Sequence, residues 1–149
     1  MYDRILIPTD GSEPARAAID EGLRLAKQND ATVHALYVVE PIPLGGFAAG
    51  AEPASAEWDD VVDEQKSEGT KAVDEVANRG DEFDVEVVTE IEYGKPNEAI
   101  LEYADEEDID AIVIGTHGRS GADRLVIGSV AEKIVRKSDV PVLTVRRGR

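Results

Sequence analysis

The chain has 149 residues and no cysteine, and its 32 acidic and 16 basic residues give a formal net charge of −16. The missing cysteines exclude a disulfide framework, a thiolate metal site and a thiol nucleophile. Acidic residues spread along the chain argue against partners that need a basic face, such as nucleic acid or an anionic membrane. The charge also favours a halophilic protein over a merely acidic mesophilic one, because a salty cell interior screens such self-repulsion.

Length and composition predict one domain over residues 1–149, with enough hydrophobic residues (42%) for a packed core. No apolar run reaches the roughly 18 residues that a membrane-spanning helix needs. The first residues lack the basic and apolar regions of a signal peptide, so we expect a cytoplasmic location.

The beginning of the chain predicts a strand, a helix and a second strand. Residues 4–9 are typical of a short buried strand. Ser12 is a suitable N-cap, and apolar residues at helical spacing predict a helix over about 13–28. Residues 32–39 are rich in β-branched side chains and predict the second strand. His34 stands among apolar neighbours there, and we expect it to pack in the sheet or at its edge rather than serve a site.

The middle of the chain predicts a long loop, a helix, an edge strand and another helix. Residues 40–55 hold prolines, glycines and alanines without periodicity. Apolar spacing predicts a helix over about 56–79, weakened by Gly69. Residues 84–92 alternate apolar and acidic side chains, which is typical of a half-exposed edge strand. The next helix is predicted over about 96–107, because proline is favourable in a first turn.

The last part predicts a strand over 111–115, a helix over about 129–138 and a strand over 142–145. Five strands alternating with four helices predict an α/β fold, an open, Rossmann-like parallel sheet with helices on both faces. The last strand is an apolar run at an expected sheet edge, and such an edge tends to pair with a second chain.

A glycine-punctuated loop follows the fourth predicted strand. Gly115 and Gly118 are followed, after nine residues, by Gly128 at the start of a predicted helix. Glycine lets the backbone come close to a ligand, and N–H groups at a helix start favour an anion such as phosphate. Open α/β sheets bind ligands at the carboxyl ends of strands. Residues 111–149 also carry a net charge of +5, whereas residues 1–110 carry −21.

Three polar residues near these strand ends each have alternative interpretations. Ser129 and Glu132 fit a capping box, or Ser129 could hold a phosphate together with the Val130 N–H. Asp10 could accept hydrogen bonds from a ribose or an adenine amino group, or from its own turn. His117 could meet a phosphate. The loop is neither a Walker A loop nor the dinucleotide fingerprint, and no zinc site or catalytic triad is predicted.

In order and spacing, these motifs resemble the universal stress protein family over nearly the whole chain. The resemblance is carried by residues 5–12, 35–39, 94–96, 110–118, 128–134 and 140–143. It implies a parallel sheet of order 3-2-1-4-5 and a homodimer joined along the last strand, Val142, Leu143, Thr144 and Val145. The intact glycine motif implies the ATP-binding branch, with Mg²⁺ or Mn²⁺ on the phosphates.

The resemblance also implies a set of binding residues. Asp10 and the backbone of Val38 would hold adenine, and Pro8 and Gly115 would flank the ribose. Thr9, between Pro8 and Asp10, completes this part of the site. The residues expected around the phosphates are His117, Gly118, Arg119, Gly128, Ser129 and Val130.

The sequence is compatible with two main classes of function and with a third that it favours less. The first is a nucleotide-dependent regulatory or stress-response switch with slow or no hydrolysis. The second is an ATPase or phosphotransfer enzyme, for which the loop offers only His117 and Asp123 as candidates. Because phosphoryl transfer needs a placed metal and a group that orients the nucleophile, we favour the switch and assign no catalytic residue or metal ligand. The third is a dimeric scaffold without nucleotide, and the intact motif counts against it.

Overall fold

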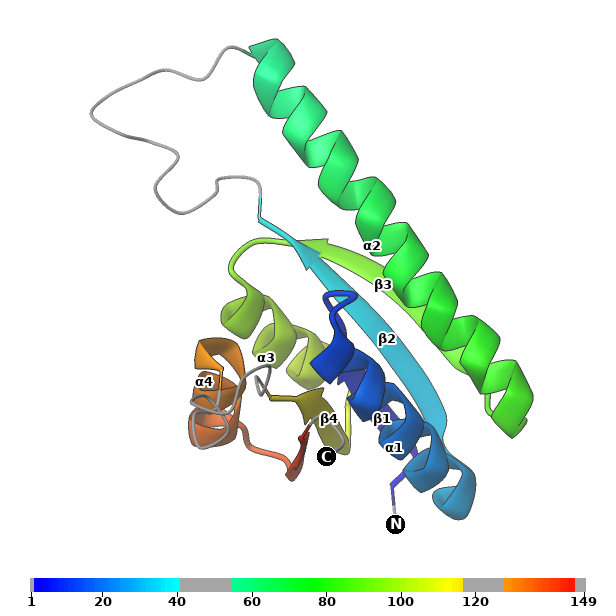
Figure 1. The fold of residues 1–149 in the computed structure, drawn as a ribbon. Helices are drawn as coiled ribbons and strands as arrows, with labels where there is room; N and C mark the ends of the chain where they lie inside the picture. The colour runs from blue at the N-terminus through cyan, green and yellow to red at the C-terminus, as the bar shows by residue number, and fades with distance from the viewer. Residues whose placement is uncertain (1, 41–54, 117–127, 147–149) are drawn as a thin grey trace.

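The computed structural model describes residues 2–40, 55–116 and 128–146. Within these ranges strands and helices alternate along the chain (Figure 1). The strands are β1 (Arg4–Pro8), β2 (Thr32–Val39), β3 (Val87–Tyr93), β4 (Ala111–Gly115) and β5 (Val142–Val145). The helices are α1 (Glu13–Asn29), α2 (Ser55–Phe83), α3 (Pro96–Glu106) and α4 (Ser129–Lys137).

The described strands form one parallel sheet in the order β3-β2-β1-β4-β5. Ile5 of β1 pairs with Val33 of β2 on one side and with Ala111 of β4 on the other, so β1 is the central strand. The direction of winding reverses between β1 and β4. The α/β fold and the strand order are therefore confirmed, with β3 and β5 at the edges.

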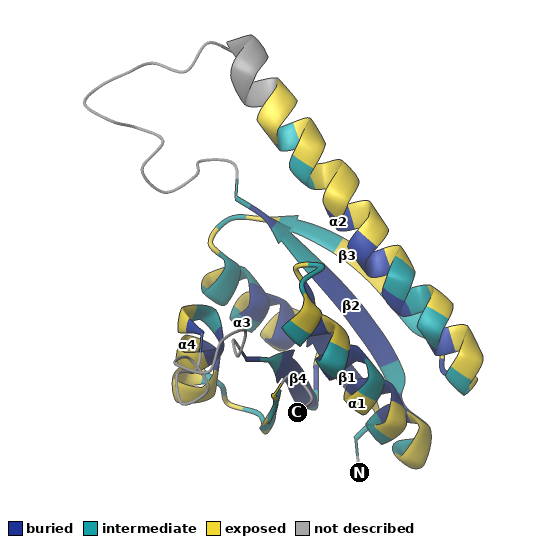
Figure 2. Ribbon diagram, viewed as in Figure 1, coloured by how far each residue is buried: buried dark blue, intermediate teal, exposed yellow. Residues whose placement is uncertain are grey.

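Helices cover both faces of the sheet. Ile5 and Ile7 pack on the face under α1 and α2, whereas Leu6 between them packs on the face under α3 and α4. Successive side chains of a strand point to opposite faces, so a strand covered on both sides appears as a continuous apolar run. Figure 2 shows the buried residues along the central strands and on the helix sides that face them.

Local signals account for the ends of α1. The Ser12 hydroxyl accepts a hydrogen bond from the Ala15 N–H at 3.4 Å, which confirms Ser12 as the N-cap. At the other end Asp30 adopts the left-handed conformation, with φ at 57°, and its N–H donates to the carbonyls of Ala26 and Lys27. The N-cap at Ser12 places the first turn of α1 directly after β1.

The helix α2 is longer than the apolar periodicity predicts and continues to Phe83 instead of residue 79. Its last turn is polar, with Arg79 paired to Glu82 at 3.0 Å. A prediction from the spacing of apolar residues cannot detect such a turn. Gly69 lies inside α2 without interrupting it. A Cβ at Gly69 would collide with the ring of Tyr37 on β2, so the glycine lets the helix lie close to the sheet.

The edge strand β3 begins at Val87, three residues later than the predicted start at Asp84. Asp84 is in the left-handed conformation, with φ at 58°, and belongs to the turn that separates α2 from the strand. The alternation of apolar and acidic residues in the sequence gives no sign of that turn in the backbone. The strand is half-exposed, as its pattern of acidic side chains predicts.

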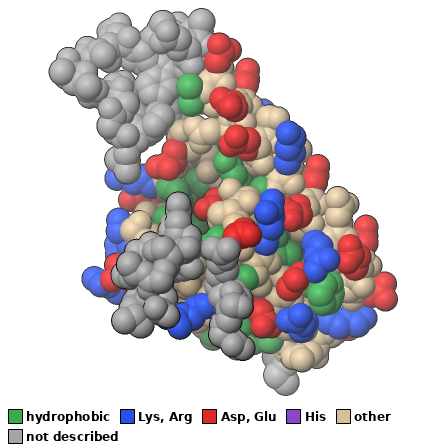
Figure 3. Space-filling model, in the orientation of Figure 1, with side chains coloured by type: hydrophobic (Ala, Val, Ile, Leu, Met, Phe, Trp, Pro, Cys, Tyr) green, Lys and Arg blue, Asp and Glu red, His purple; other side chains and the backbone are tan. Residues whose placement is uncertain are grey.

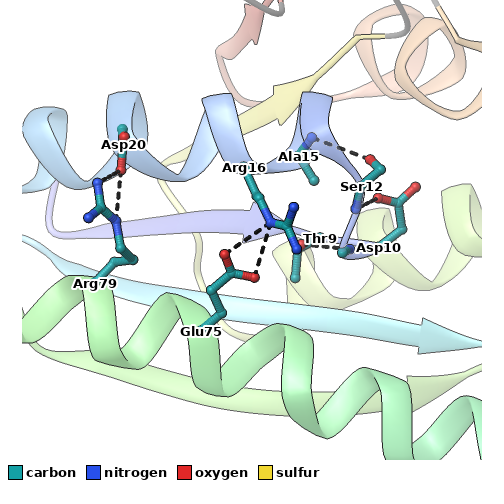
Figure 4. Close-up of polar contacts among 9 residues, drawn as sticks. Thr9, Asp10, Ser12, Ala15, Arg16, Asp20, Glu75 and Arg79 are labelled. Carbon is teal, nitrogen blue, oxygen red and sulfur yellow. Dashed lines mark hydrogen bonds and ion pairs between the residues drawn. The ribbon is translucent and has the colours of Figure 1, made fainter. Parts of the chain in front are cut away.

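Charged side chains of both signs are interspersed on the face drawn in Figure 3. Two ion pairs join α1 to α2: Arg79 to Asp20 at 2.6 Å and Arg16 to Glu75 at 3.0 Å (Figure 4). Exposed pairs of this kind contribute little stability each, about 0–1 kcal/mol. Among the described residues, no helix combines the length and the apolar character needed to cross a membrane.

Candidate functional site

A pocket of about 320 Å³ opens at the carboxyl ends of β1, β2 and β4. It lies where the winding of the sheet reverses, which is the usual ligand site of an open α/β sheet. The starts of α1, α3 and α4 also contribute to it. The described residues that line it are Pro8, Thr9, Asp10, Ser12, Pro14, Ala15, Leu36, Tyr37, Val38, Glu40, Gln65, Pro96, Ile100, Ile114, Gly115, Gly128, Val130 and Ala131.

The turn after β1 has a fixed shape (Figure 4). Thr9 Oγ1 accepts a hydrogen bond from the Gly11 N–H at 3.1 Å, and Asp10 Oδ1 accepts one from the Ser12 N–H at 2.9 Å. Gly11 has φ at 80°, a conformation that favours glycine. The interpretation that Asp10 bonds its own turn is therefore correct. Asp10 also lines the pocket, so one carboxylate group can hold the turn and face a ligand.

The backbone of Val38 presents a polar edge to the pocket. The Leu36 carbonyl accepts a hydrogen bond from the Thr9 N–H, and β1 pairs with β2 only as far as Pro8 and Leu36. Backbone groups of an extended chain alternate in direction, so the N–H and carbonyl of Val38 point the same way as those of Leu36. Because β1 has ended there, this edge faces the pocket instead of a strand.

Gln65 and Glu40 are pocket residues that the sequence analysis did not single out. The Gln65 side-chain amide donates to the Glu40 carbonyl at 2.9 Å and accepts from the Glu40 N–H at 3.0 Å. The two bonds tie α2 to the end of β2. One signal was present in the sequence: Gln65 is a polar amide on the apolar stripe of the predicted second helix.

Two glycines shape the opposite side of the pocket. A Cβ at Gly115 would collide with the Pro14 carbonyl and approach the Ala15 nitrogen to 3.0 Å, so the glycine lets α1 begin beside β4. Gly128 is buried and is the N-cap of α4, and its carbonyl accepts from the Glu132 N–H at 2.9 Å. The positive end of the α4 dipole thus lies at the pocket wall.

The capping box proposed for Ser129 and Glu132 is not formed. Gly128 is the N-cap, Ser129 is the first helical residue, and no side chain caps the start of α4. The Glu132 carboxylate instead accepts from Arg136 at 3.2 Å, one turn further along the helix. An ion pair at this spacing is compatible with helical geometry. Because Ser129 is already inside the helix, Glu132 is not the third residue after a serine N-cap, as a capping box requires.

The structure brings seven of the predicted site residues to one pocket: Pro8, Thr9, Asp10, Val38, Gly115, Gly128 and Val130. Ser129 lies between two of them on α4 but is exposed and is not part of the described lining. The remaining predictions, His117, Gly118 and Arg119, lie outside the described residues, as does Asp123.

The described part of the pocket is acidic. Its lining includes the carboxylates of Asp10 and Glu40, and no lysine or arginine is among the lining residues in the described ranges. Burial raises the pKa of the Tyr37 hydroxyl, and the nearby carboxylates of Glu68 and Asp10 raise it further. The hydroxyl therefore stays protonated near neutral pH. Within the described ranges, no three His, Asp or Glu side chains are arranged to hold a metal ion.

His34 lies outside this pocket. It is buried on β2, and its Nδ1 is 2.7 Å from the hydroxyl of Tyr103 on α3. The expectation of a packed histidine is therefore correct.

Comparisons with known proteins by sequence and by structure both find universal stress proteins. The model of the universal stress protein family matches residues 1–146. Universal stress protein MJ0531 of Methanocaldococcus jannaschii is 37% identical over 147 residues, covering 99% of this chain and 84% of the relative. The solved structure of MJ0577 from the same organism has a TM-score of 0.82 at 26% identity and covers 100% of this chain and 99% of that one. A universal stress protein solved in complex with cAMP has a TM-score of 0.71 at 26% identity, covering 99% of each chain.

Proposed function

The chain belongs to the universal stress protein family, and from this premise we propose that it binds ATP in the pocket at the ends of β1, β2 and β4. In this proposal the bound nucleotide acts as a regulatory signal and is hydrolysed slowly or not at all. The observation that carries the proposal is a pocket with two chemically different ends. One end offers the backbone edge of Val38 and the Asp10 carboxylate, and the other offers the start of α4 at Gly128.

These two ends suit the two ends of a nucleotide. A backbone N–H and carbonyl side by side match the hydrogen-bonding edge of a base, and a carboxylate accepts from an amino group or a ribose hydroxyl. A helix start favours phosphate, whereas carboxylates repel it. The similar structure solved with cAMP also supports an adenine nucleotide as the ligand class. Since the described pocket has no cluster of metal ligands, we expect Mg²⁺ or Mn²⁺ to arrive on the phosphates.

A regulatory role is supported by the kinds of side chain that the described lining could contribute to ATP hydrolysis. Its two carboxylates, Asp10 and Glu40, come from the ends of β1 and β2 and not from the start of α4. Asp10 already accepts from the Ser12 N–H. A site that binds ground-state ATP without favouring the transition state lowers the dissociation constant but not the barrier. Occupancy of such a site can be read as a signal.

The test is a calorimetric titration with ATP and Mg²⁺, comparing wild type with Gly128→Asp. Aspartate is a favourable N-cap, so α4 should still form, but its carboxylate would stand at the phosphate end. We expect binding to weaken at least tenfold, about 1.4 kcal/mol or more. Gln28→Asp adds the same charge at the exposed far end of α1 and should bind as wild type does.

Other ligands and phosphate release separate the alternatives. If cAMP or AMP binds and ATP does not, the pocket is still an adenine-nucleotide site, but ATP is not its ligand. If ATP, cAMP and AMP all give no heat of binding, a scaffold without nucleotide is favoured. Sustained phosphate release above about 1 per second at saturating ATP would favour an ATPase or phosphotransfer enzyme.

We also propose a homodimer joined along β5. This strand is an edge of the sheet, and Leu143 on it is 45% exposed. Val135 on the neighbouring helix α4 is also exposed, at 47%. An uncovered apolar edge of this kind favours pairing with a second copy.

A further inference from the structure

The Gln65–Glu40 pair has a consequence for base recognition at the Val38 edge of the pocket. Glu40 follows Val38 by two residues in extended chain, so its N–H and carbonyl continue the same backbone edge. The Val39 carbonyl between them faces β3, where it accepts from the Gly94 N–H. Gln65 occupies both groups of Glu40 and leaves those of Val38 as the edge that a base can use.

The order of donors and acceptors along this edge matters. Without Gln65 the edge would offer, in sequence, the N–H and carbonyl of Val38 and then the N–H and carbonyl of Glu40. A base could then read either donor-then-acceptor, on Val38 alone, or acceptor-then-donor, on the Val38 carbonyl and the Glu40 N–H. With Gln65 in place only the first order remains.

Purines differ in just this order. A 6-aminopurine presents a donor at its 6-position and an acceptor at N1, whereas a 6-oxopurine presents an acceptor at its 6-position and a donor at N1. A base held in one orientation by the pocket can satisfy one order but not the other, and a mismatch leaves polar groups unpaired. The Asp10 carboxylate accepts hydrogen bonds, which favours an amino group over an oxo group.

We propose that Gln65 is a specificity-determining residue, which restricts the pocket to 6-aminopurine nucleotides by covering the Glu40 backbone edge. This inference rests on the proposed function, because it concerns the base of the nucleotide bound there. Gln65 acts as a positioning residue: it controls which backbone groups are free and does not itself need to touch the ligand. The same two hydrogen bonds also anchor α2, so the test must separate selectivity from anchoring.

The experiment compares ATP with ITP, two nucleotides that differ at the 6-position and N1. Wild type should bind ATP at least about tenfold tighter than ITP, the effect of one mismatched hydrogen-bonding pair. In Gln65→Ala this ratio should fall to about threefold or less, chiefly because ITP binds more tightly to the uncovered edge. Gln65→Ser, whose side chain is too short to cover the Glu40 edge, should lower the ratio in the same direction and protects the test if the alanine variant unfolds.

Glu75→Gln is the matched control, because it weakens another contact of α2, with Arg16, at a residue outside the described lining. Its ATP-to-ITP ratio should equal that of wild type. Equal weakening of ATP and ITP by both Gln65 variants would reduce Gln65 to an anchor and overturn the inference, as would a wild-type ratio near one. If wild type binds neither nucleotide, the proposed function itself fails, and the inference fails with it.

Discussion

His34 and Tyr103 form a buried polar pair that joins β2 to α3. Their rings meet edge to face with centroids 5.7 Å apart, in addition to the 2.7 Å contact between Nδ1 and the hydroxyl. Burial lowers the pKa of His34 because it disfavours the imidazolium; Arg4 lowers it as well, and the carboxylates of Glu107, Glu90 and Glu86 oppose the shift. Burial raises the pKa of Tyr103, so its hydroxyl keeps its proton. The histidine is therefore neutral in the folded protein at neutral pH.

This pair predicts a loss of stability in acid. The unfolded chain takes up a proton on His34 near its ordinary pKa of 6.5, while the folded chain resists it, so the free energy of unfolding falls as the pH drops below that value. The contribution is at most about 1.4 kcal/mol for each pH unit. Urea unfolding of wild type and His34→Gln between about pH 7.5 and 5.5 measures it, because glutamine can bond Tyr103 but does not titrate. Parallel profiles of the two proteins would contradict this account, since both keep the same carboxylates.

At the scale of whole elements, α2 is positioned by close packing on β2. Gly69 places the helix backbone against the Tyr37 ring, and Gln65, one turn earlier, bonds the end of the strand. Tyr37 and Gln65 also line the pocket. The distance between α2 and the sheet therefore contributes to the shape of the pocket wall.

Gly69→Ala should destabilise the protein although alanine is the better helix former. The gain in helix propensity is about 1 kcal/mol, whereas overpacking against a ring typically costs about 1–3 kcal/mol. We expect a net loss of roughly 1 kcal/mol in urea unfolding. Ser67→Ala, at an exposed position of the same helix, should change stability by no more than about 0.5 kcal/mol. A Gly69→Ala protein more stable than wild type would show that the Tyr37 ring moves aside without cost.

For the molecule as a whole, charge and the free edge of β5 decide how copies meet. A net charge of −16 makes two copies repel each other unless salt screens them. The halophilic interpretation of this charge stays a prediction. The carbonyls of Pro141 and Val145 accept from β4, so the backbone groups of Val142 and Thr144 between them face away from it. These outward groups are available to a second chain.

Val142→Pro should convert the proposed dimer to monomers, because it removes an outward N–H and none that bonds β4. Light scattering at micromolar concentration in about 2 M KCl, which screens the repulsion, measures the change. Thr89→Pro is the matched control on the other edge: the Glu86 carbonyl faces β2, so by alternation the Thr89 N–H faces away from it. That variant should remain dimeric. A monomeric wild type would reject the dimer.

Much of the fold could be predicted from local patterns in the sequence. Apolar runs and helical spacing predicted each strand and helix, and Ser12 predicted the start of α1, because periodicity and capping depend on residues close together in the chain. The alternation of elements predicted a parallel sheet, while the strand order came from the family resemblance. The ends of α2 and β3 were less accurate, since the polar turn at Arg79 and the left-handed Asp84 lie outside any apolar period.

The sequence by itself also determined where a ligand site should be: at the carboxyl ends of strands, near glycines that precede a helix. Only the tertiary structure decided which side chains meet there. Gln65 reaches Glu40 across 25 residues, and Gly69 lies against a ring on another element. The start of α4 is capped by Gly128 and not by the predicted box. Such contacts depend on how far a helix lies from a strand and where each element ends, and both are set by the packing of the whole core rather than by neighbours in the chain.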